Sequence, residues 1–148
     1  MIWGAERLYL AIPALAAWYF TRQGCERKRL LLTGVCVLPL AYLAGKTAGY
    51  VYYNPRPFAA GGFLPLVRHA ADNGLPSEHT LFCAAISAVV FTSHKKFGAA
   101  LWALTLTVGV CRVAAGVHHS ADVAGAALIA VCVTWVVSRG CRRTFGLG

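Results

Sequence analysis

His118 and Asp122 are the residues whose types and spacing most directly suggest chemistry in this sequence. They are four residues apart, so they would share one face of a helix. A carboxylate that bonds one ring nitrogen of a histidine fixes its tautomer and makes the other nitrogen more nucleophilic. The pair is therefore a candidate for nucleophilic catalysis, with His118 as the nucleophile and Asp122 as its partner.

Two arginines could bind the anion that such a nucleophile would attack. Arg112 lies six residues before His118, across a turn that contains Gly116, and Arg56 offers a second guanidinium. The fork of N–H donors on arginine fits the oxygen atoms of a phosphate group. We therefore expect Arg56 and Arg112 to bind phosphate.

The stretch Pro76-Ser77-Glu78-His79 could complete such a site. Proline suits the first turn of a helix, and a helix N-terminus offers free N–H groups and a positive dipole end to an anion. Ser77 would add a hydroxyl donor to the phosphate. His79 would be placed as the general acid that protonates the leaving oxygen.

Each of these residues has a simpler interpretation when it is taken alone. A single histidine at a helix end often caps the helix, and a single arginine at a membrane edge often extends its charge into water. The neighbours His118 and His119 would diverge by about 100° on a helix, which makes them poor partners for one metal ion. Together, however, two histidines, two arginines, a serine and an aspartate favour an anion-handling site, for which we expect no metal and no cofactor.

The composition predicts that membrane helices position these residues. Apolar residues make up 58% of the 148-residue chain and charged residues 13%, whereas about 45–50% and about 25% are typical of soluble domains. Five apolar segments stand out, at residues 8–20, 30–53, 76–92, 97–115 and 121–137. The second, fourth and fifth fall within the range of roughly 17–25 residues that a spanning helix needs. We expect an all-α integral membrane bundle of about five transmembrane helices, with residues 1–148 as a single domain.

The first apolar segment is the shortest of the five unless it begins near Met1. It is not followed by the small-residue cleavage site of a signal peptide, so we expect a retained helix.

Basic residues lie in clusters between the apolar segments. They do not form a stripe interleaved with aromatic residues, which argues against a nucleic-acid partner despite the net charge of +9. Five spans would place three of the clusters on one side of the membrane, and the positive-inside rule makes that side cytoplasmic. These clusters hold nine of the 14 basic residues: Arg22, Arg27, Lys28, Arg29, Lys95, Lys96, Arg139, Arg142 and Arg143.

The candidate site residues would then lie on the external side, at the other end of the bundle. Ionisable groups near membrane depth are costly and usually functional. Their convergence from four segments is what points to a site. The residues that converge are Lys46, Arg56, Ser77, Glu78, His79, Arg112, His118, His119 and Asp122.

Three of these stretches resemble the signature motifs of the type 2 phosphatidic acid phosphatase superfamily. The stretches are Arg56-Pro57, Pro76-Ser77-Glu78-His79 and Arg112-x5-His118-x3-Asp122. The resemblance implies a helical bundle, a phosphohistidine intermediate on His118, protonation of the leaving group by His79, and no metal requirement. The first motif of that family also carries a phosphate-binding lysine, for which Lys46 is the candidate.

The sequence departs from the family pattern at three positions. Lys46 lies ten residues before Arg56 rather than seven, a shift of ~4.5 Å along a helix. Glu78 replaces the usual glycine or aspartate of the second motif, and Cys111 replaces the usual serine before Arg112. Relatives commonly have six helices, whereas five are expected here.

Within the superfamily, residues 53–58 and 69–79 look like those of the bacitracin-resistance type of undecaprenyl pyrophosphate phosphatase. The resemblance implies hydrolysis of this polyprenyl pyrophosphate to undecaprenyl phosphate and inorganic phosphate, which recycles the carrier lipid of peptidoglycan synthesis. It also implies a multi-pass protein among the lipids of the bacterial plasma (inner) membrane, with its active site facing the outside or the periplasm. Two alternatives stay open: a phosphatase for phosphatidate or phosphatidylglycerol phosphate, and a non-catalytic lipid-phosphate binder.

Overall fold

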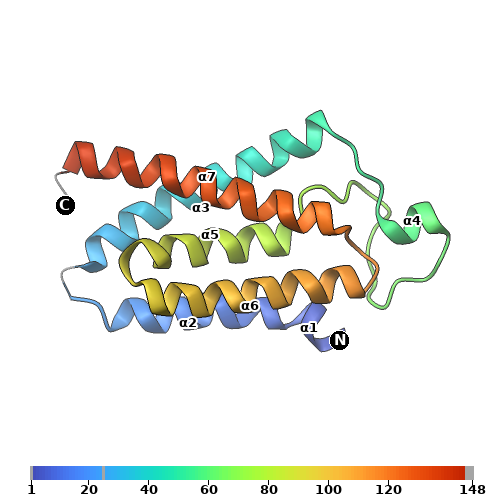
Figure 1. Cartoon of the computed structure of the whole chain (residues 1–148), viewed down its shortest axis with the longest axis horizontal. Coiled ribbons are helices and arrows are strands. Elements are labelled where there is room, and N and C mark those ends of the chain that lie inside the picture. Colours follow the sequence, from blue (N-terminus) through green and yellow to red (C-terminus); the bar gives the residue numbers. More distant parts are fainter. Residues whose placement is uncertain (1, 25, 146–148) are drawn as a thin grey trace.

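The computed structural model describes residues 2–24 and 26–145, which are helical for most of their length and contain no strand. The helices are α1 (Ile2–Glu6), α2 (Ala11–Thr21), α3 (Glu26–Val51), α4 (Pro57–Gly61), α5 (Glu78–Ser93), α6 (Lys95–Ala114) and α7 (Ser120–Phe145), and a 3-10 turn, η1 (Leu8–Leu10), lies between α1 and α2. The expected all-α bundle is confirmed (Figure 1).

Helix α5 lies at the centre of the bundle, with α2, α3, α6 and α7 packed around it (Figure 1). Most of its 16 residues are buried, among them Ala84, Ala85 and Ala88. Such small side chains let neighbouring helices approach closely. The hydroxyls of Ser87 in α5 and Thr105 in α6 share a hydrogen bond of 2.9 Å, which links the two helices. Helix α5 therefore forms a fixed axis for the site at its N-terminal end.

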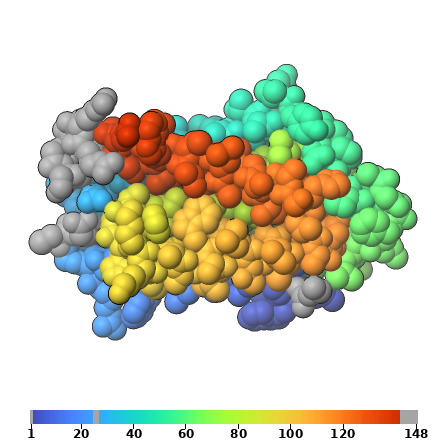
Figure 2. All heavy atoms as spheres, viewed as in Figure 1, coloured from blue at the N-terminus to red at the C-terminus, as the bar shows by residue number. Residues whose placement is uncertain are grey.

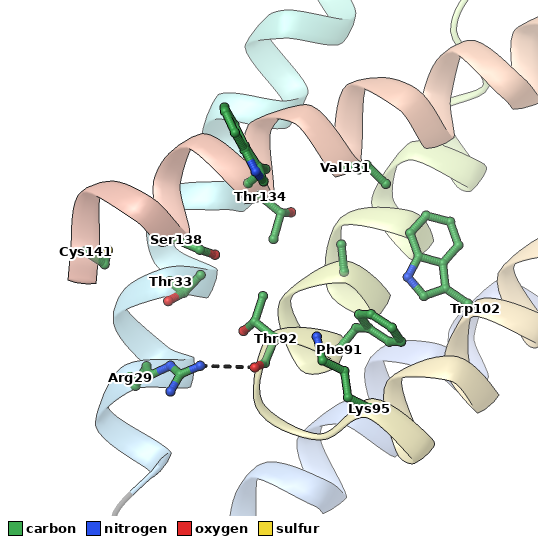
Figure 3. Close-up of a pocket in the computed structure, with 12 residues that line it drawn as sticks. Arg29, Thr33, Phe91, Thr92, Lys95, Trp102, Val131, Thr134, Ser138 and Cys141 are labelled. Carbon is green, nitrogen blue, oxygen red and sulfur yellow. Dashed lines mark hydrogen bonds between the residues drawn. The ribbon is translucent and has the colours of Figure 1, made fainter. Parts of the chain in front are cut away.

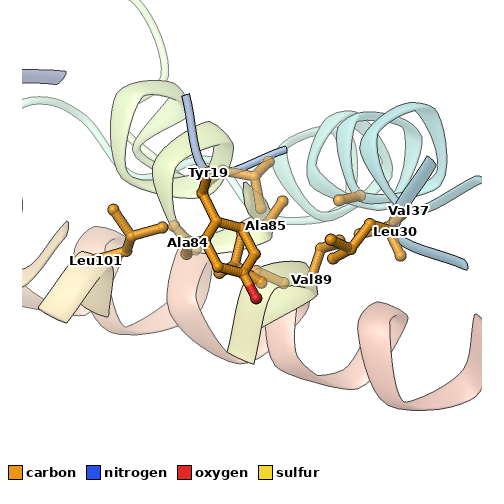
Figure 4. Close-up of a cluster of buried hydrophobic side chains, with 12 residues drawn as sticks. Tyr19, Leu30, Val37, Ala84, Ala85, Val89 and Leu101 are labelled. Carbon is orange, nitrogen blue, oxygen red and sulfur yellow. The ribbon is translucent and has the colours of Figure 1, made fainter. Parts of the chain in front are cut away.

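The largest apolar cluster surrounds this central helix. Figure 4 shows Tyr19 of α2, Val37 of α3 and Leu101 of α6 gathered around Ala84 and Ala85 of α5. Lipid is as apolar as these side chains, so at membrane depth they are stabilised by close packing more than by removal from water.

Among the described residues, three helices are long and apolar enough to span a membrane, and they correspond to the second, fourth and fifth expected segments. They are Arg27–Val51 in α3, Lys95–Ala114 in α6 and Ser120–Cys141 in α7. Large apolar side chains are exposed along them, such as Leu43, Leu106 and Val136. Figure 2 shows that α6 and α7 form much of one face of the molecule. Because lipid would solvate such side chains, the chain is a multi-pass membrane protein.

Two shorter apolar stretches, Leu8–Thr21 and Glu78–Ser93, correspond to the first and third expected segments. Pro76 was expected in the first turn of the third segment, but the helix begins only at Glu78. Ser77 is its N-cap, with an extended backbone (φ −64°, ψ 107°). The Ser77 N–H donates to the carbonyl oxygen of Asp122 (3.2 Å), which holds the residues before α5 against α7.

Helix α4 lies between the second and third apolar segments, where no apolar run predicted a helix. Pro57 occupies its first turn, and Gly62 follows it in the left-handed conformation (φ +66°). Proline at the start and glycine just past the end are the residues that these positions favour.

The two ends of the bundle carry different residues. The α2–α3 link, the α5–α6 turn and the C-terminal part of α7 lie together at one end, which gathers the basic clusters (Figure 1). The N-terminus, the segment 52–77 and the α6–α7 turn lie at the opposite end, where the candidate site residues meet.

Candidate active site

The segment 52–77 folds over one end of the bundle and is fastened there by Asn73. The side-chain oxygen of Asn73 accepts hydrogen bonds from the backbone N–H groups of Asn54 (2.9 Å) and Leu75 (3.0 Å). Its Nδ2 donates to the carbonyl oxygens of Gly49 (2.6 Å) and Tyr52 (3.0 Å). The Asn73 side chain thus joins the beginning and the end of this segment to the C-terminal end of α3.

Arg56 lies immediately before α4 and is buried, with 5% of its surface exposed. Its Nε donates to Asp72 Oδ1 (2.7 Å), and its Nη1 donates to the carbonyl oxygen of Val117 (2.9 Å). The same Nη1 lies 3.1 Å from His118 Nε2. The guanidinium is therefore held in place and faces the imidazole.

His118 lies in the turn between α6 and α7 and is 2% exposed. Its Nδ1 lies 3.0 Å from the carbonyl oxygen of Gly74 and 3.5 Å from Asp122 Oδ2. Since a carbonyl oxygen can only accept, the shorter contact assigns the ring hydrogen to Nδ1 and leaves the lone pair on Nε2. The nucleophilic nitrogen is therefore the one that faces the arginines.

Asp122 is completely buried and joins several parts of the site. Its Oδ1 accepts from Asn54 Nδ2 (2.7 Å), and its Oδ2 accepts from the backbone N–H of His119 (2.8 Å). The sequence predicted this carboxylate as the partner of His118, but it lies farther from the ring than the backbone carbonyl does. Its hydrogen bonds to Asn54 and His119 connect the segment 52–77 to the start of α7, so Asp122 also has a structural role.

Arg112 is in the last turn of α6 and is 3% exposed. Its Nη1 donates to the carbonyl oxygen of Ala5 (3.3 Å), and its Nη2 lies 3.5 Å from His118 Nε2. Its buried Nε has no partner among the described residues. Long contacts and an unpaired N–H leave this guanidinium with donors for an oxyanion.

Ser77 and His79 lie at the start of α5. Ser77 is fully buried, and its Oγ accepts a hydrogen bond from Thr80 Oγ1 (3.1 Å). Its own hydroxyl hydrogen, with the N–H groups of the first turn of α5, remains available to an anion. The His79 ring packs edge-on against Tyr9, with ring centroids 4.6 Å apart, and hydrogen-bonds to none of the other described residues.

Lys46 and Glu78, two of the departures from the family pattern, form an ion pair of 2.6 Å with each other. Both side chains are more than half exposed, and neither contacts His118. They line a cavity of about 250 Å³ that Arg56 also lines. The structure therefore places Lys46 at the rim of the site and shows that the charge of Glu78 is balanced.

His69 is a site residue that the sequence reasoning missed. Its ring lies edge-on to that of His118, with centroids 6.1 Å apart, and its Nδ1 is buried without a partner among the described residues. Asn54, Asp72 and Asn73 were missed as well. The signal in the sequence was the concentration of polar residues between His69 and Asn73, in a loop that contributes no helix to the bundle.

Burial, reinforced by the positive charges of Arg56 and Arg112, lowers the pKa of His118 to about 3. The same causes lower the pKa of His69. The His118 imidazole is therefore neutral at pH 7, as a nucleophilic nitrogen must be.

The arrangement suits attack by a nitrogen on an oxyanion such as phosphate. Two guanidinium groups flank the lone pair of His118 Nε2, and the N-terminus of α5 adds further donors. No three His, Cys, Asp or Glu side chains of the described residues are grouped so that they could hold a metal ion. Positive charge at the site comes from the arginine side chains themselves.

A family model and two well-covered relatives match this chain. A model of the PAP2 superfamily matches residues 29–144. The chain is 33% identical over 128 residues to the bacitracin transport permease protein BcrC of Bacillus licheniformis, covering 84% of this chain and 61% of that protein. It is 34% identical over 132 residues to the undecaprenyl-diphosphatase BcrC of Bacillus subtilis strain 168, covering 87% and 66%. The chain thus spans less than two thirds of the length of these relatives.

A solved structure is similar as well. The crystal structure of Aquifex aeolicus LpxE matches with a TM-score of 0.74 over 92% of this chain and 79% of that one, at 23% identity. This likeness shows a shared fold.

The histidine pair at the start of α7 gives one prediction. His118→Ala is expected to abolish turnover of a lipid phosphate, because it removes the nitrogen that contacts both Arg56 and Arg112. His119→Ala is expected to lose much less, since the Nε2 of His119 bonds the carbonyl oxygen of Pro55 (3.2 Å). His79→Ala is expected to lose about 10²–10⁴-fold in kcat, the range of general acid catalysis. Phosphate release from each purified variant measures these losses, and an active His118→Ala variant would contradict the assignment.

The lowered pKa of His118 gives a second prediction, on stability. Between about pH 6.5, the ordinary histidine value, and pH 3, the unfolded chain binds a proton at His118 that the folded chain does not. The free energy of unfolding therefore falls as the pH falls through this range. Thermal unfolding in detergent at a series of pH values should show a shallower slope for His118→Gln than for wild type. Equal slopes in the two proteins would refute the buried neutral imidazole.

Proposed function

The chain belongs to the PAP2 superfamily, and on that premise we propose that it is a membrane phosphatase that hydrolyses undecaprenyl pyrophosphate to undecaprenyl phosphate and inorganic phosphate. One observation carries the reaction type: His118 is held in a single tautomer with its Nε2 lone pair facing the N–H groups of Arg56 and Arg112. The similarity to the Bacillus subtilis undecaprenyl-diphosphatase supports the choice of lipid.

The first half of the reaction transfers the terminal phosphoryl group to the enzyme. Oxygen atoms of that group accept hydrogen bonds from the N–H groups of Arg56 and Arg112 that face the imidazole in the free enzyme. His118 Nε2 attacks the terminal phosphorus, and the bond between phosphorus and the bridging oxygen breaks. Undecaprenyl phosphate leaves with the bonding electron pair and takes a proton from His79.

The second half regenerates the histidine. Water attacks the phosphorus of the phosphohistidine, the P–N bond breaks, and inorganic phosphate leaves while the electron pair returns to Nε2. His79, which gave its proton to the leaving group, accepts a proton from the attacking water. His69, whose ring adjoins that of His118, is the second histidine available for this proton.

A pyrophosphate suits this site better than a phosphate monoester. Its leaving group is a lipid monophosphate, which leaves more readily than an alkoxide and asks less of the general acid. Its inner phosphoryl group also needs a cation, and the cavity shared by Arg56 and Lys46 offers two. Pairing with Lys46 offsets the repulsion that Glu78 would otherwise exert on this group.

We place the active site on the external face of a bacterial plasma membrane. The opposite end of the bundle carries the basic clusters, and such clusters favour the cytoplasmic side.

The substrate proposal predicts a difference between two lipids. In detergent, kcat/KM for farnesyl pyrophosphate should exceed that for phosphatidate, measured as phosphate release. Lys46→Gln should lower kcat/KM for the pyrophosphate by about tenfold, which corresponds to about 1.4 kcal/mol. The same variant should change kcat/KM for phosphatidate less. Lys96→Gln, at the opposite end of the bundle, is the matched loss of one charge and should change neither. Equal or faster hydrolysis of phosphatidate would favour the phosphatidate or phosphatidylglycerol-phosphate alternative, and no turnover of either lipid would favour a non-catalytic binder.

A further inference from the structure

A second cavity, of about 340 Å³, lies among α3, α5, α6 and α7 at the end of the bundle opposite His118 (Figure 3). We call it the distal cavity. Ser138 of α7, which lines it, is separated by ~27 Å along the helix axis from Ser120, which begins α7 just after His118. The distal cavity is therefore separate from the candidate active site.

The polar side of the distal cavity is basic. Arg29 of α3 lies there and donates to the carbonyl oxygen of Thr92 (3.0 Å). Lys95 of α6 lies above the ring of Phe91, with its Nζ 4.2 Å from the centroid. The described residues that line the cavity include no acidic one. Its electrostatic character therefore favours an anion.

Two of the hydroxyls that line the same space have no hydrogen-bond partner among the described residues. Thr134 Oγ1 and Ser138 Oγ are buried without a hydrogen-bond partner among the described residues, and Thr134 is only 4% exposed. In α6, by contrast, Thr105 and Thr107 each donate to the carbonyl oxygen four residues earlier (2.9 Å). A buried hydroxyl without a partner is costly, so such groups usually meet a ligand or water. Figure 3 shows Thr134 and Ser138 directed from α7 into the space between the helices.

The other side of the distal cavity is apolar. Trp102 of α6 and Val131 of α7 line it there, away from Arg29 (Figure 3). The cavity thus combines a cationic, hydroxyl-bearing side with an aromatic and aliphatic one. It lies near one boundary of the spanning region, because Lys95 begins one span and Cys141, which also lines the cavity, ends another. A molecule with an anionic head and an apolar chain matches this pattern.

We propose that the distal cavity binds an anionic phospholipid from the leaflet opposite the active site. The lipid phosphate accepts hydrogen bonds from Arg29, Lys95 and the hydroxyls of Thr134 and Ser138. The first part of an acyl chain lies along Trp102. This site is independent of the reaction proposed for His118, and its test does not require turnover.

The test is lipid binding to the purified full chain in detergent, measured by native mass spectrometry. Dioleoyl phosphatidylglycerol should bind, and phosphatidylcholine should bind at least tenfold more weakly. The double variant Arg29→Gln/Lys95→Gln should weaken phosphatidylglycerol binding by about fivefold for each charge removed. The matched double variant Lys28→Gln/Lys96→Gln removes two charges from neighbouring positions outside the cavity and should change the Kd less than twofold. Equal losses in the two double variants would overturn the proposal.

Thr134→Val supplies a readout that does not depend on charge. In lipid-free detergent it should raise the Tm, because it removes a buried hydroxyl without a partner. It should also weaken phosphatidylglycerol binding and so reduce the rise in Tm that this lipid causes. Inorganic phosphate and glycerol phosphate at millimolar concentration should not displace the lipid. Displacement by either would show a site for a free anion, and unchanged lipid binding by Thr134→Val would contradict the role of the hydroxyl.

Discussion

Two buried arginines that face one neutral imidazole are the constraint on which this site depends. Arg56 and Arg112 approach His118 Nε2 to 3.1 and 3.5 Å, and like charges so close in a buried site repel each other. Backbone carbonyls of Val117 and Ala5 hold the two guanidinium groups in place. The same positive charge favours an oxyanion and keeps the imidazole unprotonated, so an arrangement that is costly to bury prepares the site for attack on phosphate.

The rest of the fold serves to hold these charges still. The central position of α5 fixes the start of that helix, and Asp122 ties the loop to the start of α7. Gly74 is needed at this junction, because a Cβ there would lie 2.9 Å from Asp122 Oδ2 and 3.1 Å from the carbonyl oxygen of Asn54. Only a residue without a side chain lets the carbonyl at position 74 reach His118 without displacing the carboxylate. Rigid backbone, more than any single side chain, therefore sets the tautomer.

The sequence predicted the parts of this structure that follow from local pattern. The long apolar runs predicted α3, α6 and α7, and the polar residues at the outer ends of four segments predicted that Arg112 and His118 would lie at the same end of the bundle. What depends on tertiary contacts could not be predicted. In the sequence, Lys46 and Glu78 are two separate departures from the family motifs, 32 residues apart. In the structure they form an ion pair. The position of His69 depends on how the segment 52–77 folds over the bundle, which no periodicity in a loop can indicate.

The proposed reaction requires that the Nε2 atom of His118 becomes covalently phosphorylated. The most direct test is to mix the enzyme with farnesyl pyrophosphate labelled in its terminal phosphoryl group and to quench the reaction in alkali, which preserves phosphohistidine. Peptide mass spectrometry and NMR of the trapped protein then locate the label. Label should appear on Nε2 of His118 within one turnover and should disappear as inorganic phosphate is released. Label on Nδ1, label on another residue, or steady turnover without a labelled protein would contradict it.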